Sequence, residues 1–221
     1  MIYVKHHTTA PRKLANRFTQ GIPANPQASW QSFDGKQELK ENLTAIQNGL
    51  CAYCEIRLDS EVGNHLEHID SKSLNPHKTF EYKNIVCSCI KDSLSDNEDA
   101  NPISCGHAKR SRSIDIKPTD IECEKYFSFD LFGRVVPNEI LTIDEKRKAQ
   151  NTIDILNLNC KRLKRQRETV IDEGYKIINE LLSDTDALNN FLDLELNTVN
   201  NKYFSFINLR REHFGVFVNA N

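Results

Sequence analysis

Cysteine content constrains this chain more than any other feature. Seven cysteines occur in 221 residues, and five of them lie between Cys51 and Cys105. An odd number argues against a disulfide framework, and the N-terminus shows no apolar segment of the kind found in secretory signals. In a reducing compartment, clustered cysteines are more often metal ligands than disulfide partners. We therefore expect a cytoplasmic protein whose first half is organised around a metal ion.

Composition argues against two classes of protein, polybasic nucleic-acid coats and membrane-spanning proteins. Hydrophobic residues make up 38% and charged residues 27%, which is sufficient for a core, although a globular average is roughly 45–50% apolar. The formal net charge of −2 argues against a polybasic coat for nucleic acid, but allows a local basic patch. No run approaches the ~18 apolar residues of a membrane span, so none is expected.

Hydrophobic periodicity divides the chain into three parts. Residues 1–36, with several prolines, predict an irregular arm with room for one short helix, and 37–50 predicts a helix. The cysteine- and histidine-rich stretch 51–112 has little periodicity, and it contains the acidic, loop-like segment 93–102. Residues 37–140 are thus expected to form the functional domain, an α+β unit.

The last part is expected to be helical after one hairpin. Alternating aromatic and polar residues over 125–138 predict a β-hairpin. From residue 142 the apolar spacing becomes helical, with Thr142 and Glu145 as a capping box, and a last helix is expected over 185–199. Residues 141–221 therefore form a helical lobe in this interpretation.

“CAYC” supplies the first half of a metal site, Cys51 and Cys54. A C-x-x-C turn lets two thiolates converge on one tetrahedral ion. The alternative, a redox pair, requires a strand before the motif, whereas a helix is expected here.

The second half must come from three downstream cysteines. Cys87 and Cys89 are separated by one residue and cannot easily both bind one ion, whereas Cys89 with Cys105 closes the site by looping out 90–104. We expect a structural zinc site of Cys51, Cys54, Cys89 and Cys105, with the choice of Cys89 over Cys87 left open. Cys123 and Cys160 are expected to be small buried hydrophobes.

“HLEHID” (65–70) lies between the two halves of this site. In a strand, His65 and Glu67 share one face and His68 the other. Glu67 and His68 place a hard oxygen ligand beside a general base, and His65 is expected to be a packing residue. Asn84 precedes two apolar residues, as a cap or turn residue does.

“SCGHAKRSR” (104–112) adds His107 two residues after Cys105. A zinc ligand fixes the nearby backbone, so His107 could be held as a ligand of a second ion. Lys109, Arg110 and Arg112 would then face an anion, although a solvated cationic run is the simpler interpretation of each.

In this order the motifs resemble the HNH endonuclease family, which is built on a ββα-metal finger. The similarity is closest to HNH nucleases of the Septu and retron anti-phage systems, the PtuB type. It rests on “QNGLCAYCE” (47–55), “HLEHID”, “KNIV” (83–86), “CGHAK” (105–109) and “NTIDILNLNCKRLKRQR” (151–167), with “PRKL” (11–14) and Trp30 in the arm. The likeness is sparse before residue 37 and nearly absent after 185, and the insert 90–104 departs from it.

The resemblance implies a role for each motif residue. His68 would be the general base and Asn84 would tie the loop that orients it. Glu67 and His107 would hold one catalytic Mg²⁺ or Mn²⁺, and the four cysteines would hold structural Zn²⁺ within a finger at about 51–112. The cations Lys109, Arg110 and Arg112 would contact nucleic acid.

The resemblance also implies partners. These are a PtuA-type ATPase, docked through 141–221, and in retron versions a reverse transcriptase and its multicopy single-stranded DNA. The substrate could be DNA or RNA, including tRNA.

Two alternatives remain at this point. A non-catalytic zinc module that binds nucleic acid or protein would not need Glu67, His68 and His107. A zinc nucleobase deaminase would use H-x-E at His65, but that chemistry needs P-C-x-x-C downstream, and the C-x-x-C here lies upstream.

Overall fold

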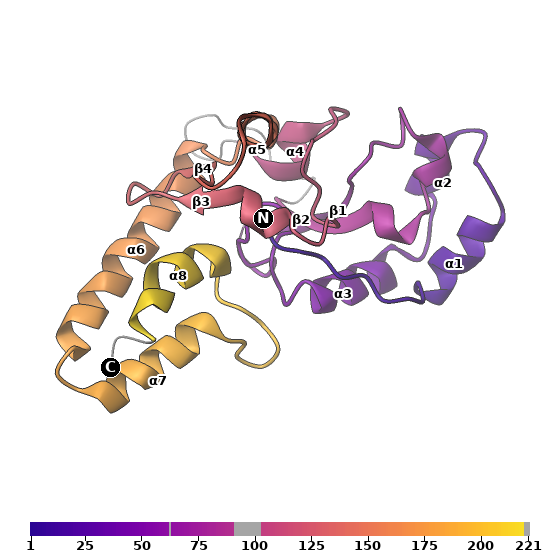
Figure 1. Cartoon of the computed structure of the whole chain (residues 1–221). Coiled ribbons are helices and arrows are strands. Elements are labelled where there is room, and N and C mark those ends of the chain that lie inside the picture. Colours follow the sequence, from indigo (N-terminus) through magenta and orange to yellow (C-terminus); the bar gives the residue numbers. More distant parts are fainter. Residues whose placement is uncertain (62, 91–102, 219–221) are drawn as a thin grey trace.

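The computed structural model describes residues 1–61, 63–90 and 103–218. The acidic segment predicted to be a loop, 93–102, lies outside the described residues. Within them the chain is a mixture of helices and two small sheets, which agrees with the expected α+β class (Figure 1).

The N-terminal arm contains two short helices where one was expected. These are α1 (Arg12–Thr19) and α2 (Pro26–Gln31). Pro26 starts α2 because its fixed φ suits the first helical position, and the Asn25 side chain caps the helix by accepting from the Ala28 amide. The predicted helix at 37–50 is α3 (Lys36–Ile46), which buries Leu39 and Leu43.

The centre of the molecule is a two-stranded antiparallel sheet. β1 (Asn64–His68) pairs with β2 (Ile85–Cys89), with His65 opposite Ser88 and Glu67 opposite Val86. Two 3₁₀ turns, Pro76–Lys78 and Tyr82–Asn84, lie between the strands. α3 and α4 (Cys105–Lys109) both contact β2, so the sheet lies next to two helices (Figure 1).

The predicted hairpin at 125–138 is confirmed as β3 (Phe127–Phe129) paired with β4 (Val135–Pro137), preceded by a 3₁₀ turn at Cys123–Tyr126. Gly133 in its turn has φ +69°, and a Cβ there would lie 2.3 Å from the Lys164 carbonyl oxygen. Glycine is therefore required where the hairpin meets the long helix.

The C-terminal part is helical, as expected. It comprises α5 (Ile143–Ile155), α6 (Lys161–Leu181), α7 (Thr185–Leu196) and α8 (Ile207–Phe214), followed by a 3₁₀ turn at Gly215–Phe217. The capping box of Thr142 and Glu145 is confirmed at the start of α5. The final helix α8 was missed in the sequence.

One hydrophobic core joins both halves of the chain. It extends from Met1 to Leu209 and includes the buried Cys123 and Cys160. A smaller cluster of Ile178, Leu188, Leu192 and Phe214 lies among α6, α7 and α8. The first and last α-helices of the C-terminal part, α5 and α8, therefore pack into the same core as the central sheet.

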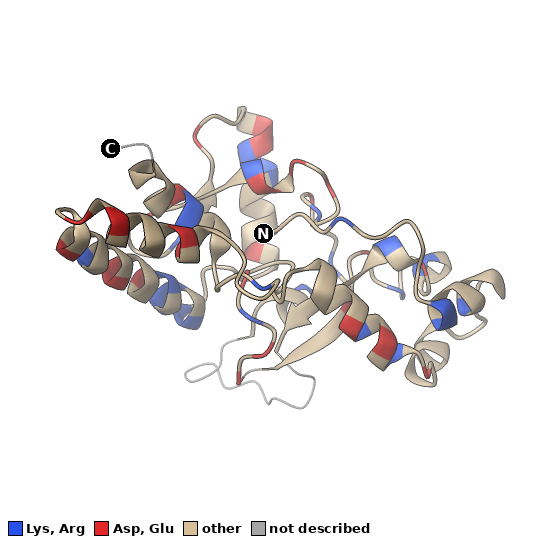
Figure 2. Cartoon of the chain, turned by 90° about the horizontal axis from the view of Figure 1, so that it is seen from below, with Lys and Arg blue, Asp and Glu red and all other residues tan. Residues whose placement is uncertain are grey.

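The surface carries both signs of charge. Acidic and basic residues are interspersed along the helices at both ends of the molecule (Figure 2), in agreement with the net charge of −2. Among the described helices, none is both long and apolar enough to cross a membrane.

Candidate metal centre and active site

Four cysteines from three separate segments meet in the core. Cys51 and Cys54 lie in the turn after α3, Cys89 ends β2 and Cys105 begins α4. Their sulfur atoms all lie within 4.8 Å of one another, and those of Cys54 and Cys105 are 3.5 and 3.6 Å from that of Cys89. A tetrahedral ion with Zn–S bonds of about 2.3 Å places its sulfurs roughly 3.8 Å apart, so the cluster fits zinc.

Charge within this cluster favours a bound cation. Burial opposes ionisation of Cys51, but hydrogen bonds from the thiols of Cys105, Cys54 and Cys89 hold its pKa well below the ordinary value. Burial, together with the neighbouring sulfurs, raises the pKa of Cys105 well above it. One thiolate thus suppresses the ionisation of its neighbour, and a divalent ion at the centre would remove that repulsion.

Cys87 lies outside the cluster and next to α3. Its sulfur lies 3.7 Å from the Thr44 hydroxyl and 3.7 Å from the Lys40 carbonyl oxygen, and burial raises its pKa to about 11. Cys89, at the end of β2, thus lies with the other cysteines, whereas Cys87, two residues earlier in the strand, contacts α3.

Glu67 lies between two basic side chains beside α4. Its Oε1 is 2.9 Å from the buried ammonium of Lys109, and its Oε2 is 3.6 Å from Nε2 of His65. Burial raises the pKa of Glu67, but the bond with His65 and the charge of Lys109 outweigh it and hold the pKa below the usual value. The carboxylate is therefore ionised.

His107 is connected to Glu67 through His65. The two imidazole rings are 4.3 Å apart between centroids, and Nδ1 of His65 donates to the Ile90 carbonyl oxygen at 2.6 Å. His65 is buried, as expected of a packing residue, yet it contacts both Glu67 and His107. His65 thus belongs to the same group of side chains as Glu67 and His107. The sequence could have indicated this, because His65 and Glu67 are two residues apart and share one face of a strand.

His68, at the end of β1, is held on two sides. Its Nε2 donates to the Thr79 carbonyl oxygen at 2.9 Å, and the ring of Trp30 from α2 meets it edge-on at 4.5 Å. Burial, with the nearby charge of Lys72, lowers the pKa of His68 to about 4. The imidazole is therefore neutral at pH 7. Its proton is on Nε2, and Nδ1 is unprotonated.

Asn84 joins β2 to the loop that follows β1. Its side-chain oxygen accepts from the Asp70 amide at 2.8 Å, and its Nδ2 donates to the carbonyl oxygens of Asp70 and Lys78 at 3.0 and 3.1 Å. This buried amide uses both its acceptor and its donors to fix the loop next to His68.

A pocket of about 210 Å³ opens in front of Glu67 and His68. Its rim includes Lys72 and Arg110, and the rest is lined by Gln27, Leu66, Ser71, Ser73 and Ser111. Lys72 was not singled out in the sequence, although “SKS” three residues after His68 could have indicated a polar rim. The pocket thus combines an acid, a neutral imidazole and two cationic side chains.

Lys109 and Arg112, predicted to contact nucleic acid, both bond within the protein. Lys109 is fully buried and bonded to Glu67 and to the Arg110 carbonyl oxygen. Arg112 donates to the carbonyl oxygens of Ala108 and Ile155, at the ends of α4 and α5. Both cations compensate internal acceptors, which leaves Arg110 as the residue of the predicted trio on the pocket rim.

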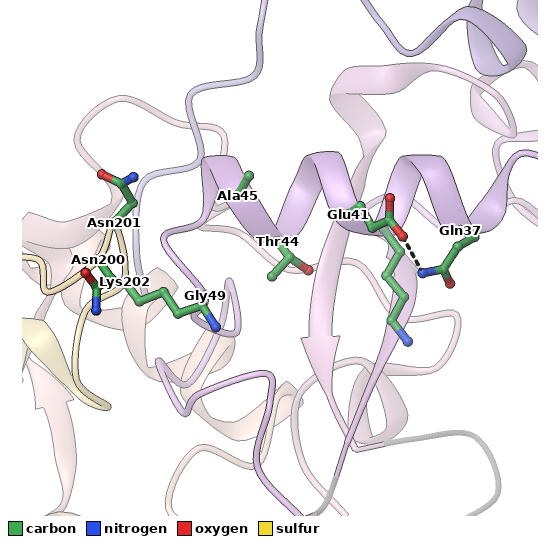
Figure 3. A pocket seen from close by; sticks show the side chains of 9 residues that line it. Gln37, Glu41, Thr44, Ala45, Gly49, Asn200, Asn201 and Lys202 are labelled. Carbon is green, nitrogen blue, oxygen red and sulfur yellow. Dashed lines mark hydrogen bonds between the residues drawn. The ribbon is translucent and has the colours of Figure 1, made fainter.

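A larger cavity lies away from these residues. It has a volume of about 430 Å³ between α3 and residues 200–202, and Gln37 and Glu41 are hydrogen-bonded on its wall (Figure 3). No predicted catalytic residue lines it. Cavity size therefore does not locate the candidate active site in this chain.

Comparison with known proteins gives three relatives. No family model matches the chain. A candidate HNH endonuclease of retron Vc95 from Vibrio cholerae is 29% identical over 165 residues, covering 73% of this chain and 78% of that protein. One of retron Ec83 from Escherichia coli is 29% identical, covering 66% and 72%. The Septu protein PtuB from Bacillus thuringiensis is 27% identical, covering 86% and 67%.

The chain is a relative of the PtuB-type HNH endonucleases. The resemblance expected from the motifs is thereby confirmed over most of the chain. The retron and Septu relatives support a nuclease of a defence system, and the cysteine cluster supports a metal-binding protein.

Proposed function

We propose that this chain is a metal-dependent endonuclease that hydrolyses phosphodiester bonds, with β1, β2 and α4 forming an HNH-type ββα-metal finger. The observation that carries the proposal is the pocket shared by Glu67 and His68, with Arg110 and Lys72 on its rim. An anionic phosphodiester there would meet a ligand for a divalent ion, a base and two cations.

His68 is the general base in this mechanism. Because Nε2 donates to the Thr79 carbonyl oxygen, Nδ1 carries the lone pair that accepts a proton from the attacking water. A pKa of about 4 makes it a weak base, but the ring is almost wholly in its neutral form at pH 7. Asn84 and Trp30 keep the ring in place.

Glu67 and His107 would hold the catalytic Mg²⁺ or Mn²⁺. Carboxylate oxygen and imidazole nitrogen suit such an ion, which would stabilise the charge that develops on the phosphate in the transition state. Gly106 brings α4 against the Glu67 carboxylate, one residue before His107. Lys109 keeps that carboxylate ionised and oriented.

Cys51, Cys54, Cys89 and Cys105 would hold a structural Zn²⁺. Four thiolates leave no open position, so this ion would take no part in hydrolysis. Its role is to join the turn after α3, the end of β2 and the start of α4, on which the candidate catalytic residues depend.

The relatives suggest the setting of this activity. We propose that the chain acts in anti-phage defence with a PtuA-type ATPase, and in a retron version with a reverse transcriptase and its single-stranded DNA. The names of the Septu and retron relatives support such partners. We propose 37–140 as the nuclease domain and 141–221 as the docking surface for the ATPase, with DNA or RNA, including tRNA, as substrate.

Metal dependence tests the proposal. The chain, alone and co-expressed with a PtuA-type ATPase from the same genome, is incubated with DNA and RNA in Mg²⁺, in Mn²⁺ and in EDTA. Cleavage should require the divalent ion, and zinc content should be unchanged by the brief chelation. Absence of cleavage under all these conditions, from protein that retains zinc, would favour a non-catalytic zinc module instead.

A further inference from the structure

Two arginines of α6, one buried and one half-buried, have no carboxylate partner in the part of the chain that the structure describes. Arg167 is 1% exposed and donates to the carbonyl oxygens of Gly133 and Leu158. Arg162 is half-buried and donates to the Ser104 hydroxyl at 3.0 Å. The Nε–H of each is buried with no hydrogen-bond partner. Uncompensated buried charge is costly, so each guanidinium requires negative charge nearby.

Both side chains point to the segments that bear the cysteines. Ser104, which accepts from Arg162, immediately precedes Cys105. The guanidinium of Arg167 lies 5.3 Å from the ring centre of Phe206, whose amide donates to the carbonyl oxygen of Glu55, the residue after Cys54. Arg162 thus contacts the residue before Cys105, and Arg167 is connected to the residue after Cys54 through Phe206.

The cysteine sulfurs act electrostatically on both arginines. Burial lowers the pKa of Arg162, but the electrostatic influence of Cys54, Cys89, Cys160 and Cys105 outweighs it and raises the pKa above the ordinary value. For Arg167, burial lowers the pKa, with Cys54, Glu55 and Cys105 opposing. The Glu55 carboxylate is already bonded to the Met1 amino group at 2.6 Å and to the Asn208 amide, which leaves the thiolates as the larger unmatched charge.

The net charge of a zinc centre connects the cysteine cluster with the two arginines. A zinc ion bound by four thiolates carries a net charge of about −2 and is buried here, which is itself unfavourable without nearby cations. We propose that Arg162 and Arg167 are the counter-charges of the zinc–tetrathiolate centre, and that they tie α6 to metal retention. This inference rests on the zinc site proposed above.

The coupling works in both directions. Removing either positive charge weakens zinc binding, because the dianionic centre loses its compensation. Removing zinc leaves two buried cations on α6 uncompensated, so the helix loosens together with the metal site.

Zinc release from the full-length chain tests this inference. Four variants are compared with the zinc-loaded wild type: Arg162→Met, Arg167→Met, the charge-conserving Arg167→Lys, and Arg165→Met as an exposed control on the same helix. Release is followed with the indicator 4-(2-pyridylazo)resorcinol. Cobalt substitution, read through its sulfur-to-metal charge-transfer bands, reports whether four thiolates still bind.

Each methionine variant should release zinc at least about tenfold faster than wild type, which corresponds to roughly 1.4 kcal/mol. Arg167→Lys should stay closer to wild type, and Arg165→Met should match it. Unchanged release from Arg162→Met and from folded Arg167→Met, while the wild type holds one zinc, would overturn the inference. If Arg167→Met does not fold, Arg162→Met decides. A wild type without zinc would instead overturn the zinc site itself.

Discussion

At the scale of single residues, Gly106 shows how closely α4 approaches β1. A Cβ at this position would lie 2.8 Å from the Glu67 carboxylate carbon and 2.8 Å from Nε2 of His65. The residue thus has no room for a side chain while Glu67 keeps its position. “CGH” in the sequence could not reveal this, because the contact partners lie about 40 positions away.

We expect Gly106→Ala to displace the Glu67 carboxylate. Cleavage should fall by at least about tenfold, and more Mn²⁺ should be needed for half-maximal activity, because misplacing a ligand weakens the ion that it binds. The measurement is a Mn²⁺ titration of cleavage. Gly215→Ala is the matched control, since nothing lies within 4 Å of a Cβ at that position. Equal titration curves for all three proteins would contradict this account of the site.

The choice between Cys87 and Cys89 is also a question for single residues. Sequence spacing left it open because both cysteines follow the same apolar pair, whereas in the structure Cys89 ends β2 within the cluster and Cys87 contacts α3. Strand alternation does not separate the two, because residues two apart share one face of a strand.

We therefore expect opposite outcomes for two conservative changes. Cys54→Ser should lose zinc and misfold, because structural zinc supplies roughly 10 kcal/mol or more of apparent folding free energy. Cys87→Ser should retain one zinc per chain and lose only stability from its packing site. Zinc measured by mass spectrometry on each purified chain checks this, and loss of zinc from Cys87→Ser would contradict the assignment.

At the scale of elements, the sequence predicted those with local signals. α3 and α5 have apolar spacing or caps, the hairpin of β3 and β4 has alternation, and each was found. α8 has a weak pattern, and its preceding residue Phe206 has φ +65° and donates to Glu55. Tertiary packing rather than local propensity positions that helix, which is why the sequence did not show it.

The N-terminal arm is attached to the central sheet through His6. Its Nε2 donates to the Ile85 carbonyl oxygen at 2.9 Å, and its ring meets Tyr82 edge-on at 4.7 Å. Burial lowers the pKa of His6, although the bonds with Ile85 and Val4 oppose this. The folded protein therefore binds fewer protons at this position than the unfolded chain below a pH of about 6.5.

The sign of the pH effect follows from that difference. The stabilisation is present above a pH of about 6.5 and is lost as the pH falls below it. We expect the unfolding free energy of wild type to fall more steeply between about pH 6.5 and 5 than that of His6→Gln. Urea unfolding at several pH values measures this, with His7→Gln as a control for net charge. An unfolding free energy that falls more steeply with pH in His6→Gln than in wild type would contradict the contact between His6 and the central sheet.

At the scale of the whole molecule, the parts predicted as separate units share one core. The Cys105 amide donates to the Leu156 carbonyl oxygen at 2.7 Å, and the Arg57 amide donates to the Ser205 hydroxyl at 3.0 Å. A truncation after residue 140 would therefore remove support for the metal site as well as any docking surface. Residue composition changes near residue 140, and this change predicted a boundary there. A single sequence does not show which surfaces pack against each other across that boundary.

The candidate site divides in the same way between what sequence can and cannot predict. Its cysteines, Glu67 and His68 follow from residue type and spacing, because metal ligands and bases come from few residue types. The burial of Lys109, the rim position of Lys72 and the contact of Trp30 with His68 depend on the three-dimensional packing of distant segments. Sequence therefore indicated the chemistry, and the structure indicates which side chains reach the pocket.

The central claim is that His68 is the base of a metal-dependent nuclease. Its most direct test compares cleavage by wild type, His68→Ala and His77→Ala, an exposed histidine of the adjacent loop, in Mn²⁺ with zinc content measured on each protein. We predict that His68→Ala loses at least about a hundredfold in rate, as expected when a general base is removed, while it keeps its zinc and His77→Ala cleaves normally. Cleavage by His68→Ala at the wild-type rate would contradict the account.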